Sequence, residues 1–330
     1  HYRQRHALSM KERLVAYLPR YAPWVARWGW LMNLRDQIPG LAALSERLLG
    51  FSSKRGFPKW RSDFFREKLT EPAQREAGVS IKAAERECVL LVDTFNRYFE
   101  PENARAAVAV LRAAGYTVHL PQAADGGRPL CCGRTFLSAG LVDEAKVEAL
   151  RMIQTLQPYT ERGVPVVGLE PSCLLGLRDE FLSLLPGVDS AALGMNAFLF
   201  EEFIVREQVA GRLKLDLKPL PQQKALLHGH CHQKAFAVMP DVERALKLVP
   251  GLAVETIESS CCGMAGAFGY EAAHYDVSMK MAELSLLPRV RKAGAGELIV
   301  ADGTSCRHQI RDGAGREALH VAHVLERALL

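Results

Sequence analysis

The chain has 330 residues, of which 48% are hydrophobic, and a formal net charge of +5. This composition supports more than one folded core and excludes a chain that is mostly disordered. The 42 basic and 37 acidic residues are spread without a basic arm, so nucleic acid is not indicated as a partner. No apolar run is long enough to span a membrane, and no signal peptide is recognisable. We expect a cytoplasmic protein, with a peripheral position at the inner membrane as the alternative.

Residues 1–84 have the periodicity of helices, interrupted by Pro23, Pro39 and Pro58. The chain starts at His1 inside this polar helical pattern, which indicates a piece of a longer protein. Tryptophans and phenylalanines alternate with arginines in this lead-in segment. Packing against the rest of the chain or a missing partner domain is the favoured interpretation. Docking on a membrane surface is the alternative, although the segment lacks a clean two-faced pattern.

The remaining sequence divides into two halves that repeat one order of elements: strand, helix, strand, double cysteine, long helix, strand. Strands that alternate with helices predict an α/β fold with parallel sheets, and the repeat predicts two domains related by a pseudo-twofold axis. The expected domains are residues 85–190 and 224–330, joined by a connector over 191–223 with a helix near 197–208. Expected strands are 88–92, 117–120, 164–169, 225–227, 253–257 and 297–301, and expected helices are 101–114, 143–157, 240–251 and 273–292.

Six of the eight cysteines follow one repeated pattern. A Cys-Cys-Gly tripeptide, at 131–133 and again at 261–263, is followed in each half by a later Ser-Cys pair. Adjacent cysteines make a poor disulfide because the ring that they close is strained, whereas two neighbouring thiolates at a turn suit a metal or iron-sulfur centre. The isolated Cys88, at the start of a strand, is expected to be a core residue.

In the second half, each patterned cysteine follows the end of an expected strand. The carboxyl ends of parallel strands gather at one edge of a sheet, which is where open α/β folds bind ligands. Four thiolates from distant parts of the sequence are therefore expected to meet there, and four is the usual ligand number of an iron-sulfur cluster. The predicted metal ligands are Cys231, Cys261, Cys262 and Cys306.

The first half has only three cysteines in the equivalent places, Cys131, Cys132 and Cys173. Where Cys231 would be matched, the sequence reads Asp-Thr-Phe at 93–95. The three thiols are expected to form a decayed second site or to contribute to one shared centre.

Histidines surround one of the predicted ligands. His228, His230 and His232 alternate around Cys231, and an extended segment would place all three on one side. An imidazole in such a place can ligate metal, donate a hydrogen bond to a cluster sulfur or move a substrate proton. These histidines keep a zinc site open as an alternative, because two cysteines with histidines suit tetrahedral zinc.

Four segments carry a family resemblance: DTFNRYFEP at 93–101, LEPSC at 169–173, HGHCHQKA at 228–235 and DGTSCRHQI at 302–310. Over about residues 85 to 330 the pattern resembles the cysteine-rich (CCG) domain that occurs twice in the B subunit of heterodisulfide reductase, the iron-sulfur subunit of glycolate oxidase and the C subunit of anaerobic glycerol-3-phosphate dehydrogenase. It is more closely similar to the carboxyl-terminal part of fused FAD-linked oxidases of the D-lactate and D-2-hydroxyglutarate dehydrogenase type.

The resemblance implies an iron-sulfur module that passes electrons from a flavin toward a quinone or another carrier. The family pattern often ends in Cys-x-x-Cys, but the earlier position is Glu170 in one half and Gly303 in the other. A four-cysteine [4Fe-4S] cluster is therefore expected instead of a five-cysteine non-cubane one. No dinucleotide fingerprint occurs, so FAD is expected on a missing domain or partner, beside a ferredoxin-like domain. An oligomer is expected.

The resemblance also implies roles for residues around the cysteines. Gly133 and Gly263 would allow a tight backbone after each cysteine pair, and Arg134 and Lys234 would add positive charge. The residues expected around the ligands also include His230, His232, Arg307 and His308. Two other functions stay open, namely a zinc-stabilised docking domain and a thiol or disulfide reductase module like that of heterodisulfide reductase.

Overall fold

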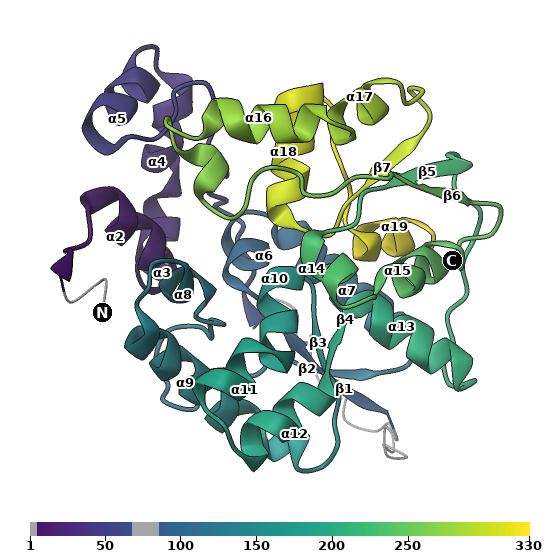
Figure 1. Ribbon diagram of the computed structural model, residues 1–330. Coiled ribbons are helices and arrows are strands. Elements are labelled where there is room, and N and C mark those ends of the chain that lie inside the picture. Colours follow the sequence, from purple (N-terminus) through teal and green to yellow (C-terminus); the bar gives the residue numbers. More distant parts are fainter. Residues whose placement is uncertain (1–4, 68–85) are drawn as a thin grey trace.

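Two parallel β-sheets, each built by one half of the chain, organise the structure (Figure 1). It is a computed structural model that describes residues 5–67 and 86–330. The first sheet has the strand order β2-β1-β3-β4 and the second the order β6-β5-β7, and every pair is parallel. The predicted α/β class is confirmed, whereas a pseudo-twofold axis stays a prediction. The strands are β1 (Glu87–Leu91), β2 (Thr117–His119), β3 (Val166–Gly168), β4 (Ala197–Leu199), β5 (Lys224–Leu227), β6 (Ala253–Thr256) and β7 (Leu298–Val300).

The strands of the second sheet end at the same level. Leu227, the last residue of β5, pairs with Thr256 at the end of β6 and with Val300 at the end of β7. The first sheet has a similar register, since Leu91 pairs with Gly168 at the ends of β1 and β3. The loops that carry the cysteines therefore leave each sheet along one edge.

Helices follow each strand, as the alternation predicted. In the first half they are α6 (Thr94–Tyr98), α7 (Pro101–Ala113), α8 (Arg134–Ser138), α9 (Val142–Thr160), α10 (Pro171–Leu174), η3 (Leu175–Arg178), α11 (Glu180–Leu184), α12 (Val188–Asn196) and α13 (Phe200–Val209). In the second half they are α14 (Cys231–Ala235), α15 (Met239–Leu246), η4 (Phe268–Tyr270), α16 (Tyr275–Glu283), α17 (Leu286–Arg291), α18 (Thr304–Ala314) and α19 (Val321–Arg327). Helices α7 and α19, one from each half, pack against each other.

Two expected helices differ from the structure. The helix expected over 273–292 is divided into α16 and α17 at Ser285, because Pro288 has no N–H to donate and its ring would clash with the carbonyl four residues earlier. The helix expected from Ala197 starts at Phe200, since residues 197–199 form β4 and pair with β3. This strand lies in the expected connector and yet belongs to the first sheet.

The lead-in segment lies along one flank and touches both halves (Figure 1). It contains α2 (Met10–Ala16), α3 (Leu18–Val25), η1 (Ala26–Trp28), α4 (Gly29–Gln37) and α5 (Leu41–Leu49). Thr135 Oγ1 donates to the Ala16 carbonyl at 2.8 Å, and Ser52 N–H donates to the Tyr270 carbonyl at 2.8 Å. Its aromatic residues divide between two environments: Trp60 packs on Phe99, while three tryptophans are exposed, Trp24, Trp28 and Trp30. Part of the predicted segment, residues 68–84, lies outside the described residues.

One hydrophobic core extends through both halves and includes Leu111, Leu156, Val242 and Leu325, all fully buried. Cys88 belongs to this core, as expected for an isolated cysteine. Burial, with a smaller effect of nearby Glu207, raises the pKa of its thiol to about 12. Among the residues that the structure describes, no helix has the length and apolar character needed to cross a membrane.

A buried ion pair joins the halves near the cysteine loops. Arg307 of α18 donates from Nε and Nη2 to the carboxylate of Glu100, at 2.9 and 2.5 Å. Burial alone would raise the pKa of Glu100, but the charge and hydrogen bonds of Arg307, with smaller effects of His308 and Thr304, together outweigh burial and lower the pKa from 4.5 to about 2. This ion pair therefore contributes stability above pH 4.5 that is lost as the pH falls through about 2.

We expect Glu100→Gln to lower the free energy of unfolding by about 3 kcal/mol near neutral pH, because Arg307 stays buried without its counter-charge. Between pH 4.5 and about 2, the variant should also lose less stability on acidification than the wild type. Urea unfolding at several pH values measures both effects. Glu102→Gln is the control, because the Glu102–Arg61 pair is partly exposed and should contribute less than about 1 kcal/mol. Equal losses in the two variants would contradict the assignment.

Candidate metal centre

The structure brings together the four cysteines of the second half. Cys231 is the first residue of α14, Cys306 lies in the first turn of α18, and Cys261 and Cys262 occupy the loop after β6. Their thiols interact in a chain, from Cys231 to Cys261, to Cys262 and to Cys306. Cys262 and Cys306 are buried, Cys261 is half-buried and Cys231 is exposed. The group thus has a buried end and an end at the surface.

These four thiols divide into two acidic and two weakly acidic groups. Hydrogen bonds from Cys231 and Cys262 lower the pKa of the Cys261 thiol, and a hydrogen bond from Cys262 lowers the pKa of Cys306 well below its usual value. The pKa values of Cys231 and Cys262 are raised by the same contacts, followed by burial. Two thiolates are therefore stabilised within the group, and the thiolate is the form that binds metal.

The backbone after the cysteine pair has the tight turn that Gly263 was expected to provide. Gly263 has a φ of +86°, and its N–H donates to Cys261 Sγ at 3.3 Å. A Cβ added at this position would lie 2.3 Å from the carbonyl oxygen of Ser278. Only glycine fits both the left-handed backbone and the close approach of α16.

Lys234, a residue of α14, forms hydrogen bonds with the loop that contains the cysteine pair. Its Nζ donates to the carbonyls of Ser259 and Ser260, the latter at 2.9 Å. Burial lowers the pKa of Lys234, although the four cysteines act in the opposite direction. The predicted positive charge is thus held beside the thiols by two backbone carbonyls.

The histidines around Cys231 do not form the extended segment that their alternation suggested. The chain turns into α14 at Cys231, and His230 becomes the N-cap, accepting a hydrogen bond at Nδ1 from the His232 N–H at 3.2 Å. Cys231 Sγ lies 3.8 Å from His230 Nδ1 and 3.5 Å from His232 Nδ1. Burial, followed by the nearby His230 and Arg134 charges, lowers the pKa of His232 to about 4.

His228 faces the buried end of the group. A ring nitrogen of His228 and the Sγ atoms of Cys262 and Cys306 all lie within 4.8 Å of one another. Nδ1 is hydrogen-bonded to Ser259 Oγ at 2.8 Å, and the buried Nε2 has no hydrogen-bond partner among the described residues. The sequence indicated His228 by its place directly after β5. It could not indicate the hydrogen bond with Ser259, because Ser259 is distant in sequence.

Arg307 and His308, expected around the cysteines, make their hydrogen bonds elsewhere. Arg307 donates to Glu100 and to the carbonyls of Ala301 and Asp302. His308 Nδ1 lies 2.6 Å from the Tyr270 hydroxyl, and burial lowers the pKa of its imidazole to about 4. Both side chains therefore connect α18 to other parts of the chain.

Asp302 connects the helices that present Cys231 and Cys306. Its Oδ2 accepts from Gln233 Nε2 of α14 at 2.8 Å, and its Oδ1 accepts from the Val321 N–H of α19 at 3.0 Å. Gln233 Oε1 in turn accepts from the His230 N–H at 2.9 Å. The sequence did not predict this network. Its side chains Gln233 and Asp302 are fully buried, and the network fixes the starts of α14 and α18.

The three cysteines of the first half also lie together. Cys132 interacts with both Cys131 and Cys173, and the Gly133 N–H donates to Cys131 Sγ at 3.3 Å, with a φ of +76° at Gly133. All three thiols have raised pKa values. In place of a fourth cysteine, Thr94 starts α6. This group is thus one ligand short, as the sequence indicated.

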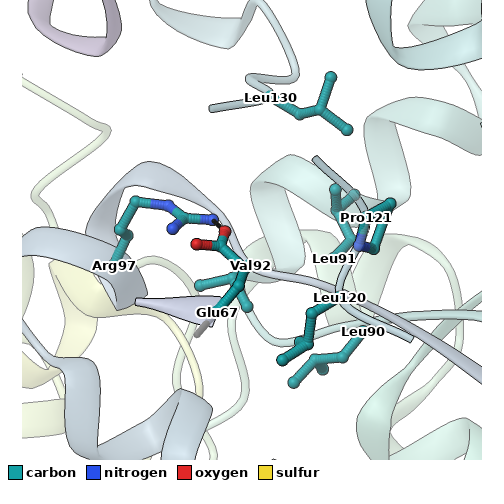
Figure 2. Close-up of a pocket in the computed structure, with 8 residues that line it drawn as sticks. All are labelled: Glu67, Leu90, Leu91, Val92, Arg97, Leu120, Pro121 and Leu130. Atoms are coloured by element: carbon teal, nitrogen blue, oxygen red, sulfur yellow. Dashed lines mark ion pairs between the residues drawn. The ribbon is translucent and has the colours of Figure 1, made fainter. Parts of the chain in front are cut away.

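The first group borders a hollow of about 10 Å³, which is lined by Cys132, Arg134, Leu137, Ser172, Cys173, Gly176, Glu180 and Phe181. A second hollow of about 10 Å³, enough for roughly one water molecule, lies at the carboxyl ends of β1 and β2. Figure 2 shows the Arg97–Glu67 ion pair, 2.7 Å long, on one side of it and apolar side chains on the other. The hollow is lined by Glu67, Leu90, Leu91, Val92, Arg97, Leu120, Pro121 and Leu130.

Polar contacts connect the two groups of cysteines. Arg134, beside Cys132, forms hydrogen bonds with Glu180 and with His232 Nε2. Glu170 Oε2, from the first half, accepts from the Thr304 N–H at the start of α18, at 2.9 Å. The two cysteine loops therefore belong to one polar interface.

Gly303, where the family pattern often has a further cysteine, has no room for a side chain. A Cβ at this position would lie 2.4 Å from His230 Cδ2. The imidazole of His230 occupies the space that a cysteine would need, which supports the expectation of four cysteines.

The donor set suits a thiophilic metal. It contains four thiols, two of them with lowered pKa, and a buried imidazole nitrogen without a partner among the described residues. Thiolate and imidazole ligands select iron-sulfur clusters or zinc, whereas magnesium and calcium prefer oxygen. The residues therefore fit the iron-sulfur cluster that the resemblance implies.

We expect Gly263→Ala to lower the free energy of unfolding by about 3 kcal/mol, because it combines a left-handed backbone with a steric clash. The matched control is Gly266→Ala in the same loop, where φ is +66° and no atom lies within 4 Å of the added Cβ. That variant should cost only about 1 kcal/mol. Thermal or urea unfolding measures both losses, and equal losses would show that the Ser278 contact is unimportant.

Comparisons with known proteins agree with this site. Residues 225–311 match the family model of the cysteine-rich domain, CCG. The C subunit of anaerobic glycerol-3-phosphate dehydrogenase from Escherichia coli (strain K12) is 26% identical over 300 residues, which cover 91% of this chain and 72% of that protein. D-2-hydroxyglutarate dehydrogenase of Pseudomonas putida is 28% identical over 265 residues, 78% of this chain but 24% of that protein. Lactate utilization protein A 1 of Bacillus anthracis is 22% identical over 253 residues, 73% of this chain and 98% of that protein. The family resemblance predicted from the motifs is thus confirmed, and residues 225–311 are similar to the cysteine-rich (CCG) domain.

Proposed function

We propose that this chain is the iron-sulfur electron-transfer module of a flavin-dependent D-2-hydroxyacid dehydrogenase. The observation that carries the proposal is the convergence of four thiols at one edge of the second sheet. Cys231, Cys261, Cys262 and Cys306 are the proposed ligands of a [4Fe-4S] cluster. Such a cluster, when bound, takes up and releases one electron at a time.

The surrounding residues have roles that follow from their contacts. The Gly263 N–H already donates to Cys261 Sγ, and hydrogen bonds of this kind raise the reduction potential of a cluster. The ammonium group of Lys234 favours the more negative, reduced state. Burial of Cys262 and Cys306 keeps water from one side, while the exposed Cys231 marks the side from which an electron donor or acceptor approaches.

The first-half group is proposed as a remnant or auxiliary site. Cys131, Cys132 and Cys173 lack a fourth thiol, and their raised pKa values disfavour the thiolate form. Its loop still supports the second half, through the hydrogen bond from Arg134 to His232.

The substrate class and partners come from the relatives. Two of them are by name dehydrogenases or dehydrogenase subunits, for glycerol-3-phosphate and for D-2-hydroxyglutarate. This chain spans 24% of the Pseudomonas protein, so the flavin and the hydroxyacid site are proposed to lie on another domain or subunit. A ferredoxin-like domain as electron donor and a quinone or other carrier as acceptor complete the proposal, in a cytoplasmic oligomer or at the inner membrane surface.

Anaerobic purification followed by analysis of iron, acid-labile sulfide and zinc tests the proposal. We expect about four iron and four sulfide per chain and a paramagnetic signal after reduction. Cys262→Ser should abolish most of the signal, because this thiol interacts with both Cys261 and Cys306.

Cys132→Ser is the matched control, since Cys132 holds the same position in the first tripeptide. It should leave most of the signal. Loss of the signal in this variant but not in Cys262→Ser would place the cluster in the first half. Stoichiometric zinc without sulfide would contradict the electron-transfer function and support a zinc-stabilised docking domain instead.

A further inference from the structure

Three titratable side chains without exposed surface meet outside the two groups of cysteines: Glu201 of α13, Asp302 before α18 and His320 at the start of α19. One oxygen or nitrogen atom of each lies within 4.8 Å of the others. We propose that Glu201 is a neutral carboxylic acid that shares its proton with Asp302, and that this proton positions α14 and α18, the helices that present cysteines of the centre. The positioning role rests on the proposed function, whereas the shared proton concerns the folded chain alone.

The carboxyl group of Glu201 receives no hydrogen bond from a donor among the described residues, although both of its oxygens are buried. An ionised carboxylate in such a place would lose its hydration without compensation, which costs far more than burial of a neutral acid. The group within hydrogen-bonding reach is Asp302, which is itself a carboxyl group. A hydrogen bond between two carboxyl groups needs a proton on one of them.

The contacts of Asp302 identify it as the ionised partner. Its Oδ2 accepts from Gln233 Nε2 and its Oδ1 from the Val321 N–H. Asp302 also precedes α18, a helix of 11 residues whose N-terminus favours a negative charge. The proton therefore belongs to Glu201. Burial, followed by the charge of Asp302, accordingly raises the pKa of Glu201 well above 4.5.

His320 cannot supply the missing proton. Its Nδ1 accepts from the Ala322 N–H and its Nε2 is bonded to the Leu169 carbonyl, both at 3.0 Å, so the ring proton lies on Nε2. Burial lowers the pKa of this imidazole, which keeps it neutral. The other charged groups that act on the three side chains are Glu100, Glu202 and Arg307. The buried residues of α15, β3 and β4, which also pack against α13, are apolar.

The shared proton is connected to the helices of the centre through Asp302. Asp302 holds Gln233 of α14, and Gln233 Oε1 accepts from the His230 N–H, directly before Cys231. Loss of the Glu201 proton would place a second buried negative charge beside Asp302, and the repulsion would act on the starts of α14 and α18. Glu201→Gln keeps a donor toward Asp302 but cannot ionise.

Infrared spectroscopy of the anaerobically purified protein at neutral pH is the first test. A protonated carboxyl group has a C=O band that ionised carboxylates lack, and exchange into D₂O shifts this band. We expect one such band to disappear in Glu201→Gln. Glu202→Gln is the matched control and should keep the band, because the neighbouring Glu202 accepts from Arg178. A spectrum unchanged by Glu201→Gln would overturn the inference.

Urea unfolding between about pH 5 and 8 tests the same proton independently. A carboxyl group whose pKa is raised on folding contributes stability that is complete below pH 4.5 and is lost as the pH rises toward the raised pKa. The folding equilibrium constant of Glu201→Gln should therefore increase relative to the wild type, by up to about tenfold per pH unit. Glu202→Gln should show no such increase. A difference between Glu201→Gln and the wild type that does not depend on pH would contradict the shared proton.

Release of iron to a chelator tests the positioning role. At alkaline pH it should be about tenfold faster in the wild type than in Glu201→Gln, because only the wild type ionises at this position. Equal rates would overturn the positioning role and leave the proposed function standing. Zinc without sulfide would overturn the proposed function, while the infrared and unfolding measurements would still decide on the proton. A stoichiometric divalent cation that Glu201→Gln removes would show that a metal ion, and not a proton, joins the two carboxyl groups.

Discussion

The three strands of the second sheet end at the same level, and the candidate centre depends on this constraint. Leu227 pairs with both Thr256 and Val300, so three loops start at the same height and on the same edge. Each loop then needs only a few residues to bring its cysteine to the others. A shift of one residue in either strand pair would turn the strand over and displace its loop. Hydrogen bonds between backbones thus position thiols that are far apart in sequence.

Polar contacts between the halves hold this edge in place. Glu170 accepts from the backbone at the start of α18, and Glu100 pairs with Arg307 one turn later on the same helix. His320 Nε2, at the start of α19, is bonded to the Leu169 carbonyl at 3.0 Å. The first half therefore acts as a scaffold for the helix that presents Cys306. This explains physically why its LEPSC segment can matter even where its own cysteine group is incomplete.

The sequence predicted the sheets and the grouping of thiols because both depend on local patterns. Buried strands have apolar runs, and cysteines after such runs must gather at the carboxyl edge. The sequence could not predict which partners the polar side chains choose across the interface. Arg307 bonds to Glu100, and His228 bonds to Ser259, because of how separate elements pack. The prediction of an extended segment through the three histidines was wrong. His230 caps α14, and alternation alone does not reveal a cap.

The two groups of cysteines differ in charge as well as in number. A hydrogen bond with Cys132 lowers the pKa of Cys173, but burial and the nearby carboxyl groups of Asp93 and Glu170 raise it to about 11 overall. Burial raises the pKa of both carboxyl groups as well. In the second half, Cys306 lies near His228 and His230, which lower its pKa further. Acidic neighbours thus oppose thiolates in one half, and imidazoles favour them in the other. Of the two groups of cysteines, only that of the second half contains thiols whose pKa values are lowered toward the metal-binding form.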